Sequence, residues 1–485
     1  SNEPAHVLFS DYGQGDVLHK LDQRHNELAV NCKVGMATAA VIFPFQELAD
    51  RQEVTIRTSL PSDEYVYGHK RCPRPAPRLS WSETMDQTCS LRLPDYQLNS
   101  LYENAVHTLV LLSAKDVVPG PYTYRRFWFR DACFMLHALL NLGFVDSVGR
   151  IIEAFPLRQK KSGYFQSQAG EWDSNGQVLW LLDRYEQLSK RQLDPKWIPS
   201  IQSAVKWIRK KRTSTQTNAP HAGLLPAGFS AEHLGPNDYY YWDNFWAVAG
   251  LHSAASLFRR HGLIQDARFA DHVGNDLLQT LWKSLEAVPD HRKSGGIPAS
   301  PYRRMDAGAV GSLVADYPLQ ITPAGDKSIM NTVDYLVQTC FHQGGFFQDM
   351  IHSGINPYLT LCIAQTLLRN QDLRCIQMLR TVADLASPTG QWPEAIHPLT
   401  HGGCMGDGQH GWAASEWVMM LRNLFIREEK DALILGSGLD PAWLKSKEPL
   451  KFGPTLTPFG RISVFAQKTE HQGVVFSIHG DVNPG

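Results

Sequence analysis

The chain has 485 residues, of which 47 are Lys or Arg and 48 are Asp or Glu, so its net charge is close to zero. A chain of this length exceeds one simple domain and can bury an extensive core. The balanced charge gives no electrostatic reason to expect nucleic acid or an anionic membrane as a partner. Aromatic residues make up 10% of the chain and include 13 tryptophans, which can fill a core or stack on sugar rings.

The eight cysteines include no Cys-x-x-Cys pair, and several, such as Cys362, lie in apolar stretches with helical spacing. Buried free thiols are typical of a reducing compartment. No apolar run reaches transmembrane length, and no signal peptide opens the sequence as given. We therefore predict a cytoplasmic protein, although a leader removed before Ser1 is compatible with the same sequence.

Residues 1–92 carry short alternating stretches of β-branched residues, such as 53–58 (EVTIRT), punctuated by Gly and Pro. Alternation of this kind favours strands. We expect a β-sandwich-like domain in this region.

Residues 93–430 have apolar residues at helical spacing, as at Phe134, Leu136, Leu139 and Leu140. Roughly a dozen such segments, separated by loops rich in Gly and Pro, predict a mainly α protein with an (α/α)6-barrel catalytic domain. In that fold, inner helices are ringed by outer ones and the loops at one end form a sugar-binding funnel. An α-solenoid is the alternative, but the chain shows no repeat of fixed period. Residues 431–485 return to strand patterns, and we expect them to be the start of a longer C-terminal β segment.

The segment Trp128-Phe129-Arg130-Asp131 leads into the first expected inner helix. At a helix start, Arg130 and Asp131 can point into the funnel and hold sugar hydroxyls through charge-assisted hydrogen bonds, beside the ring of Trp128. The alternative is an ordinary first-turn Asp with an Arg partner.

A second polar cluster, residues 168–177, contains Glu171, Trp172 and Asp173. Asp173 can simply cap the following helix. Together with Trp172 it can instead bind sugar. Glu171 and Asp173 are also reserve candidates for a catalytic acid, and Glu232 is a weaker one.

Asp243 lies in the aromatic stretch 239–246 (YYYWDNFW). Neighbouring rings exclude water, which raises the pKa of a carboxyl group and keeps it protonated near neutral pH, as a general acid must be. We therefore predict Asp243 as the acid and expect Tyr241 and Trp242 to contact the sugar. An Asp that caps or pairs within a buried helix is the alternative.

Glu394 follows a Trp-Pro pair in a loop rich in Gly. A carboxylate on such a loop can hold a water molecule opposite the acid, as a general base does, and Trp392 can line the same site. A surface glutamate is the alternative. The nearby His397, His401 and His410 are compatible with zinc, but their spacing matches no helical ligand pair. We expect neither a metal nor a cofactor.

Taken together, these motifs resemble glycoside hydrolase family 15, the glucoamylase and glucodextranase group, and also amylo-alpha-1,6-glucosidase-type barrels. The resemblance spans most of residues 120–425. The family's Trp-x-Arg-Asp element, which holds the hydroxyls of the terminal sugar, is matched by 128–131. Its acid follows a Gly-Leu-Pro loop and a Tyr-x-x-Trp pattern, matched by 223–226 and 239–243, with Asp243 where the family usually has Glu. Its base ends a Gly-x-x-x-Glu pattern, matched by 390–394.

A further stretch, 349–358, resembles the family's acidic segment ending in Gly-Asn-Pro-Trp, but Phe346 stands where the family has a sugar-binding Arg. The resemblance implies an inverting, exo-acting glycoside hydrolase that releases a terminal sugar, α-linked glucose, from an oligo- or polysaccharide. Asp243 would be the acid and Glu394 the base. The alternatives are a sugar phosphorylase on the same barrel and a non-catalytic glycan-binding protein.

Overall fold

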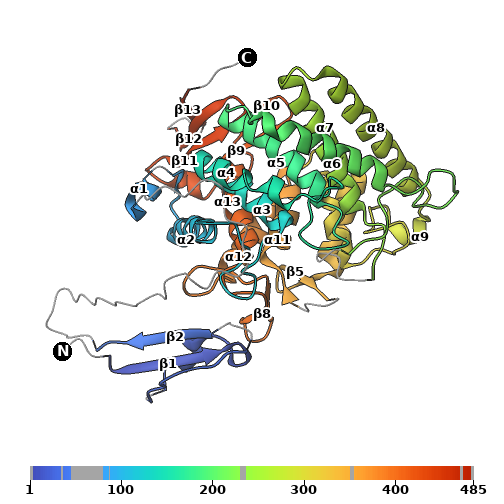
Figure 1. Cartoon of the computed structure of the whole chain (residues 1–485). Helices are drawn as coiled ribbons and strands as arrows, with labels where there is room; N and C mark the ends of the chain where they lie inside the picture. Colours follow the sequence, from blue (N-terminus) through green and yellow to red (C-terminus); the bar gives the residue numbers. More distant parts are fainter. Residues whose placement is uncertain are drawn as a thin grey trace.

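The computed structural model describes residues 4–23, 25–33, 37–44, 80–86, 88–229, 236–349, 354–469 and 473–481. Their main body is a ring of helical hairpins, each pairing an outer helix with the inner element that follows it (Figure 1). The outer helices are α2 (Tyr96–Leu112), α4 (Val145–Ile152), α6 (Ile198–Lys211), α8 (Ile264–Glu286), α10 (Lys327–Thr339) and α12 (Arg374–Asp384). The inner elements are α3 (Phe129–Asn141), α5 (Ser174–Ser189), α7 (Tyr241–Arg260), the 3-10 helix η5 (Ala307–Ala315), α11 (Pro357–Arg369) and α13 (Gly411–Phe425).

The inner elements form a closed ring, because each packs against the next and α13 packs against α3. This closure confirms the predicted (α/α)6 barrel and excludes an open solenoid. One inner position is occupied by η5 rather than by an α-helix. Because every inner element follows an outer helix, the inner elements run in the same direction and their N-terminal ends meet at one end of the barrel.

The sequence distinguishes inner from outer helices by how apolar residues are distributed around them. All 15 residues of α13 are buried, as is typical of a helix surrounded by other elements. By contrast, α8 has 23 residues, and the buried ones form a single stripe that includes Ala270, Val273, Leu277 and Leu281. Spacing of three and four residues places this stripe on one face, which packs against α7.

The inner helices α5 and α7 cross closely at a pair of glycines. A Cβ on Gly176 would lie 2.1 Å from the carbonyl oxygen of Trp246, and one on Gly250 would lie 2.5 Å from the Cα of Gly176. Only glycine fits at either position without moving a helix backbone.

Two antiparallel sheets lie at opposite ends of the barrel (Figure 1). The first contains β4 (Phe341–His342), β5 (Gly345–Gln348), β6 (Gly354–Ile355), β7 (Ala395–Ile396) and β8 (Gly403–Met405). Its strands lead into the N-terminal ends of α11 and α13. The second has the order β13-β12-β11-β3, with β3 (Ser90–Arg92), β11 (Leu450–Thr457), β12 (Gly460–Lys468) and β13 (Val474–Gly480). The hairpin of β9 (Ile426–Glu429) and β10 (Ala432–Leu435) continues from the C-terminal end of α13.

The described part of residues 1–92 contains the antiparallel hairpin of β1 (His6–Asp11) and β2 (Ala37–Ile42), the short helix α1 (Trp81–Met85), and β3. Because β3 pairs with β11, this region and residues 431–485 share a sheet. A β-sandwich is not established by the described residues, and the strand predicted at 53–58 lies outside them. The division at 92 and 430 stays a prediction.

Shorter elements are η1 (Tyr12–Gln14), η2 (Val17–Lys20), η3 (Phe155–Arg158), η4 (Pro195–Trp197), α9 (Asp290–Lys293) and η6 (Trp443–Lys445). Within the described ranges, no helix is long and apolar enough to cross a membrane.

Candidate active site

The predicted site residues converge on the end of the barrel where the inner helices begin. Trp128 directly precedes α3, and Asp173 directly precedes α5. Asp243 lies in the first turn of α7, and Glu394 directly precedes β7 in the loop that leads to α13. Far-apart motifs therefore share one end of the barrel because the fold aligns their helix starts.

A buried ion-pair network connects the starts of α3, α5 and α7. The Arg130 side chain is 4% exposed, and its Nε lies 2.7 Å from Asp173 Oδ2, while its Nη1 lies 3.5 Å from Glu171 Oε1. Trp242 Nε1 donates to the same Asp173 oxygen at 2.8 Å. A buried guanidinium requires such partners. Asp173 does occupy the N-cap position of α5, but its side chain makes no capping bond there and pairs with Arg130 instead. Glu232 lies outside the described residues.

Asp243 lies beside this network and is almost completely buried, with 1% of its surface exposed. Burial, followed by the charges of Asp173, Glu171 and Asp243, raises the pKa of the nearby Tyr164. These carboxylates are therefore near neighbours. Glu171 and Asp173 pair with Arg130, and the burial of Asp243 makes it the candidate for a proton donor here.

Glu394 is 7% exposed and is held from two sides. Its carboxylate accepts a short hydrogen bond from the Tyr124 hydroxyl, and its backbone carbonyl accepts one from Asn356 Nδ2 at 3.0 Å. Burial, and next the charge of Glu394, raise the pKa of Tyr124. The phenol therefore stays protonated and donates to the carboxylate. The surface-glutamate alternative is wrong in this structure.

The loop that carries Tyr124 is fixed by a second buried carboxylate. Asp407 accepts hydrogen bonds from the backbone N–H groups of Tyr122, Thr123 and Tyr124 at 3.1, 2.7 and 3.0 Å. Sequence analysis missed both Tyr124 and Asp407. The only local signal was the Gly-Asp-Gly at 406–408, because Asp407 and its partners are separated by more than half of the chain.

Asp131 links the two carboxylate clusters. It follows Arg130 in the sequence, and its Oδ1 lies 3.8 Å from Nε2 of the buried His410. The His410 ring lies 6.1 Å from the Tyr124 ring, which in turn lies 5.7 Å from Trp128. His410 thus faces Asp131 and Tyr124. Among the described residues, no group of three or more His, Cys, Asp or Glu side chains is arranged to hold a metal ion.

Three predicted sugar-contacting rings lie in the walls around this site. Trp172 is half-buried, with Lys211 Nζ 3.9 Å from the centre of its ring. Tyr241 is fully buried, and its hydroxyl lies 3.0 Å from Ser284 Oγ on α8. Trp392 is 2% exposed and donates to a backbone carbonyl of α12. Tyr241 and Trp392 therefore offer no open ring face to a sugar in this structure.

No protein-family model matches the sequence, and no curated protein matches it. Solved structures do match. A glycosidase aligns with a TM-score of 0.52 and 16% identity, over 69% of this chain and 99% of its own. The GH78 family rhamnosidase of Bacillus sp. GL1 aligns with a TM-score of 0.60 and 15% identity, over 81% of this chain and 42% of its own. A bacterial glucoamylase complexed with acarbose aligns with a TM-score of 0.51 and 14% identity, over 70% of this chain and 57% of its own.

These likenesses show that the chain shares the (α/α)6 fold of these glycosidases. They do not single out family 15, because a rhamnosidase and a glucoamylase both match. At 14 to 16% identity, the likeness to these structures is one of fold alone.

Proposed function

We propose that the protein is an inverting, exo-acting glycoside hydrolase in which Asp243 is the general acid and Glu394 the general base. The observation that carries this proposal is the presence of two buried carboxylates from different elements at the same end of the barrel. Hydrolysis with inversion needs one carboxylic acid to protonate the leaving oxygen and one carboxylate to activate water on the opposite face of the ring. The shared fold with three glycosidase structures supports the same class.

The contacts of Glu394 and Asp243 suit different roles. A hydrogen bond donated by Tyr124 favours the ionised form of Glu394 and fixes its orientation, as a base requires. Burial beside Trp242 favours the protonated form of Asp243, as an acid requires. Arg130 and Asp131 lie in the first turn of α3, at the same end of the barrel, where they can hold the hydroxyls of a terminal sugar.

The terminal sugar is proposed to be α-linked glucose, because the Trp-x-Arg-Asp element at 128–131 has the family's sugar-holding pattern. An α-linked rhamnose is the second candidate, because the rhamnosidase likeness covers 81% of this chain. Phe346 is fully buried, so that position supplies no charged group to either sugar.

The test is hydrolysis of a panel that includes isomaltose, maltotriose and an aryl α-rhamnoside, with and without inorganic phosphate. We expect phosphate-independent turnover that falls by about 1000-fold or more in Asp243→Asn and in Glu394→Gln. The matched controls Asp290→Asn and Glu286→Gln change exposed carboxylates and should leave the rate unchanged.

Other outcomes identify the alternatives. Turnover that requires phosphate and survives Glu394→Gln would indicate a phosphorylase. Saccharide binding without turnover, unaffected by either substitution, would indicate a glycan-binding protein.

A further inference from the structure

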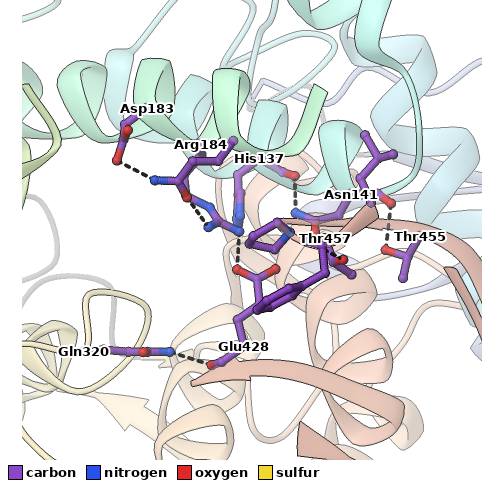
Figure 2. Close-up of polar contacts among 12 residues, drawn as sticks. His137, Asn141, Asp183, Arg184, Gln320, Glu428, Thr455 and Thr457 are labelled. Atoms are coloured by element: carbon purple, nitrogen blue, oxygen red, sulfur yellow. Dashed lines mark hydrogen bonds and ion pairs between the residues drawn. The ribbon is translucent and has the colours of Figure 1, made fainter. Parts of the chain in front are cut away.

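A cavity of about 760 Å³ lies at the end of the barrel opposite Asp243 and Glu394. Every element of the inner ring, or the segment that directly follows it, contributes to the wall. The contributing residues include His137, Trp180, Ser253, Tyr317, Gln365 and Asn423. The volume falls within the range of small-molecule sites. Figure 2 shows His137 of α3, Arg184 of α5 and Glu428 of β9 gathered at this end of the barrel.

A column of aromatic rings separates this cavity from the candidate active site. Phe134 stacks on Trp412 with ring centres 4.5 Å apart and meets Trp246 edge-on at 5.7 Å. Trp246 meets Trp180 at 5.5 Å, and Trp180 meets His137 at 4.7 Å. These packed rings come from α3, α5, α7 and α13, and the lining of the cavity includes neither Asp243 nor Glu394. The cavity is a separate site.

The four arginines that line the cavity, Arg184, Arg369, Arg422 and Arg427, are each paired with a carboxylate, and Lys430 and Asp431 add one charge of each sign to the lining. Glu428 pairs with both Arg184 and Arg422, the latter at 2.9 Å. Arg369 pairs with Asp316 at 2.5 Å and with Glu429 at 2.7 Å. Arginines that are already paired with carboxylates favour an uncharged ligand over an anion, since an anion would have to displace a carboxylate.

The remaining polar groups are suited to hydroxyl groups. Gln365 Nε2 donates to the Tyr317 hydroxyl at 3.1 Å, and Asn423 Nδ2 donates to Gln365 Oε1 at 3.0 Å. This arrangement forms a preordered chain of amides and a phenol along one wall. Rings at Trp180 and Phe459 line the same cavity. Flat rings beside neutral hydrogen-bonding groups are the features with which proteins bind pyranoses.

His137 points to a ligand independently of the cavity's shape. Its side chain is 8% exposed, and its Nε2 is buried without a hydrogen-bond partner among the described residues. A buried polar atom in this condition is costly unless something binds it. Burial, with Arg184 and Arg422 nearby, holds the pKa of His137 well below its usual range. Its neutral ring can therefore donate or accept one hydrogen bond through Nε2, depending on the tautomer.

We propose that this cavity at the C-terminal ends of the inner helices is a second ligand site, which binds a neutral monosaccharide or a similar small polyol. His137 Nε2 and the Gln365–Asn423 amides bond its hydroxyls, and Trp180 contacts its ring. The site does not depend on the catalytic roles of Asp243 and Glu394, so the two proposals can fail separately.

The test uses D-glucose and L-rhamnose as neutral probes, because neither contains a bond to hydrolyse, and inorganic phosphate as the anionic probe. Binding is measured by titration calorimetry on three proteins. In Ala249→Trp, a large side chain is added at a half-buried position that lines the cavity. In Ala287→Trp, the same change is made at an exposed position after α8, away from the cavity. The third protein is the unmodified chain.

We expect at least one of the sugars to bind the unmodified chain and Ala287→Trp equally, and Ala249→Trp to weaken binding at the cavity at least tenfold. If the catalytic end also binds the sugar, Ala249→Trp removes one of two sites. If it does not, Ala249→Trp removes the only binding detected. Sugar binding that is unchanged in Ala249→Trp would overturn the proposal, as would binding of phosphate alone.

A second measurement needs no change in the cavity. In protein labelled with ¹⁵N-histidine, the Nε2 resonance of His137, identified by its loss in His137→Gln, should shift on addition of the sugar that binds. The shift should persist in Asp243→Asn, which alters the catalytic end. A His137 resonance that does not move at saturating sugar would contradict the proposed site.

Discussion

At the scale of single residues, the Tyr124 side chain orients the Glu394 carboxylate and favours its ionised form. The Tyr124 hydroxyl donates to it, and the raised pKa of Tyr124 keeps that hydroxyl protonated. Sequence reasoning found Glu394 from its loop and Asp243 from its aromatic surroundings. It could not find Tyr124, because the two partners lie 270 residues apart and nothing in the local sequence around 124 marks it as catalytic.

The substitution Tyr124→Phe removes this hydrogen bond and keeps the ring. A hydrogen bond to a charged group is worth about 1.5–3 kcal/mol, so we expect kcat to fall by roughly 10- to 100-fold. The acidic limb of the pH–rate profile should move to higher pH, because the lost bond favoured the ionised carboxylate. Steady-state kinetics between pH 4 and 8 measure both effects. An unchanged profile would show that Tyr124 does not act on the base.

Glu416 gives a prediction about stability. Burial on α13 raises the pKa of this carboxyl group to about 7, and a smaller opposing effect comes from the Trp412 indole. Between the ordinary value of 4.5 and about 7, the folded state binds more protons than the unfolded state. Stability is therefore lost as pH rises through this window.

Glu416→Gln replaces the titrating carboxyl group with an amide, so the variant does not lose stability in this way as the pH rises. Thermal unfolding at pH 5 and pH 8 should show the variant more stable than the unmodified protein at pH 8, by up to about 3 kcal/mol, with a smaller difference at pH 5. The same pH dependence in both proteins would mean that Glu416 does not titrate in this window.

At the scale of elements, the sequence predicted the helices better than the strands. Inner and outer helices differ in apolar spacing, which is a local property and can be read without a structure. The sheet of β4 to β8 is built from strands of two to four residues, too short to give an alternating pattern. The 3-10 helix η5 has an apolar sequence (AGAVGSLVA) with two glycines, which lowers its helical propensity.

The loop before α3 depends on Asp407 for its shape. Asp407→Ala leaves three backbone N–H groups without their acceptor, so we expect Tyr124 to lose its position and kcat to fall at least as far as in Tyr124→Phe. Because both changes act on the same contact, the double variant should be little slower than Asp407→Ala alone. Kinetics of the two single variants and the double variant test this. Additive losses would show that Asp407 acts by another route.

At the scale of the whole molecule, the candidate active site and the C-terminal strands lie at opposite ends of the barrel. The candidate active site lies where the inner helices begin, and β9 to β13 pack where they end (Figure 1). Arg422 at the end of α13 connects them. It donates to Thr455 on β11 at 3.2 Å and pairs with Glu428 on β9 at 2.9 Å. The sequence predicted strands here but could not show that they anchor the far end of the barrel.

Arg422→Ala should therefore reduce stability without changing the chemistry. Removing one partner of a buried ion pair costs about 3–5 kcal/mol, and we expect a lower melting temperature with kcat at 20 °C nearly unchanged. Arg92→Ala is the matched control, because the Arg92–Glu448 pair is exposed and 3.8 Å long and should contribute little. Equal melting temperatures for the two variants would contradict the role of Arg422.

The central claim is that Asp243 and Glu394 hydrolyse a glycosidic bond with inversion. Time-resolved proton NMR of the first turnovers on an α-linked substrate tests it most directly, because the anomeric proton of the released sugar reports its configuration before mutarotation. The account predicts that the β anomer appears first and that Asp243→Asn and Glu394→Gln release sugar at least about 1000-fold more slowly. Initial release of the α anomer would instead indicate retention, which requires a carboxylate nucleophile, and would contradict the assignment of Glu394 as a base that activates water.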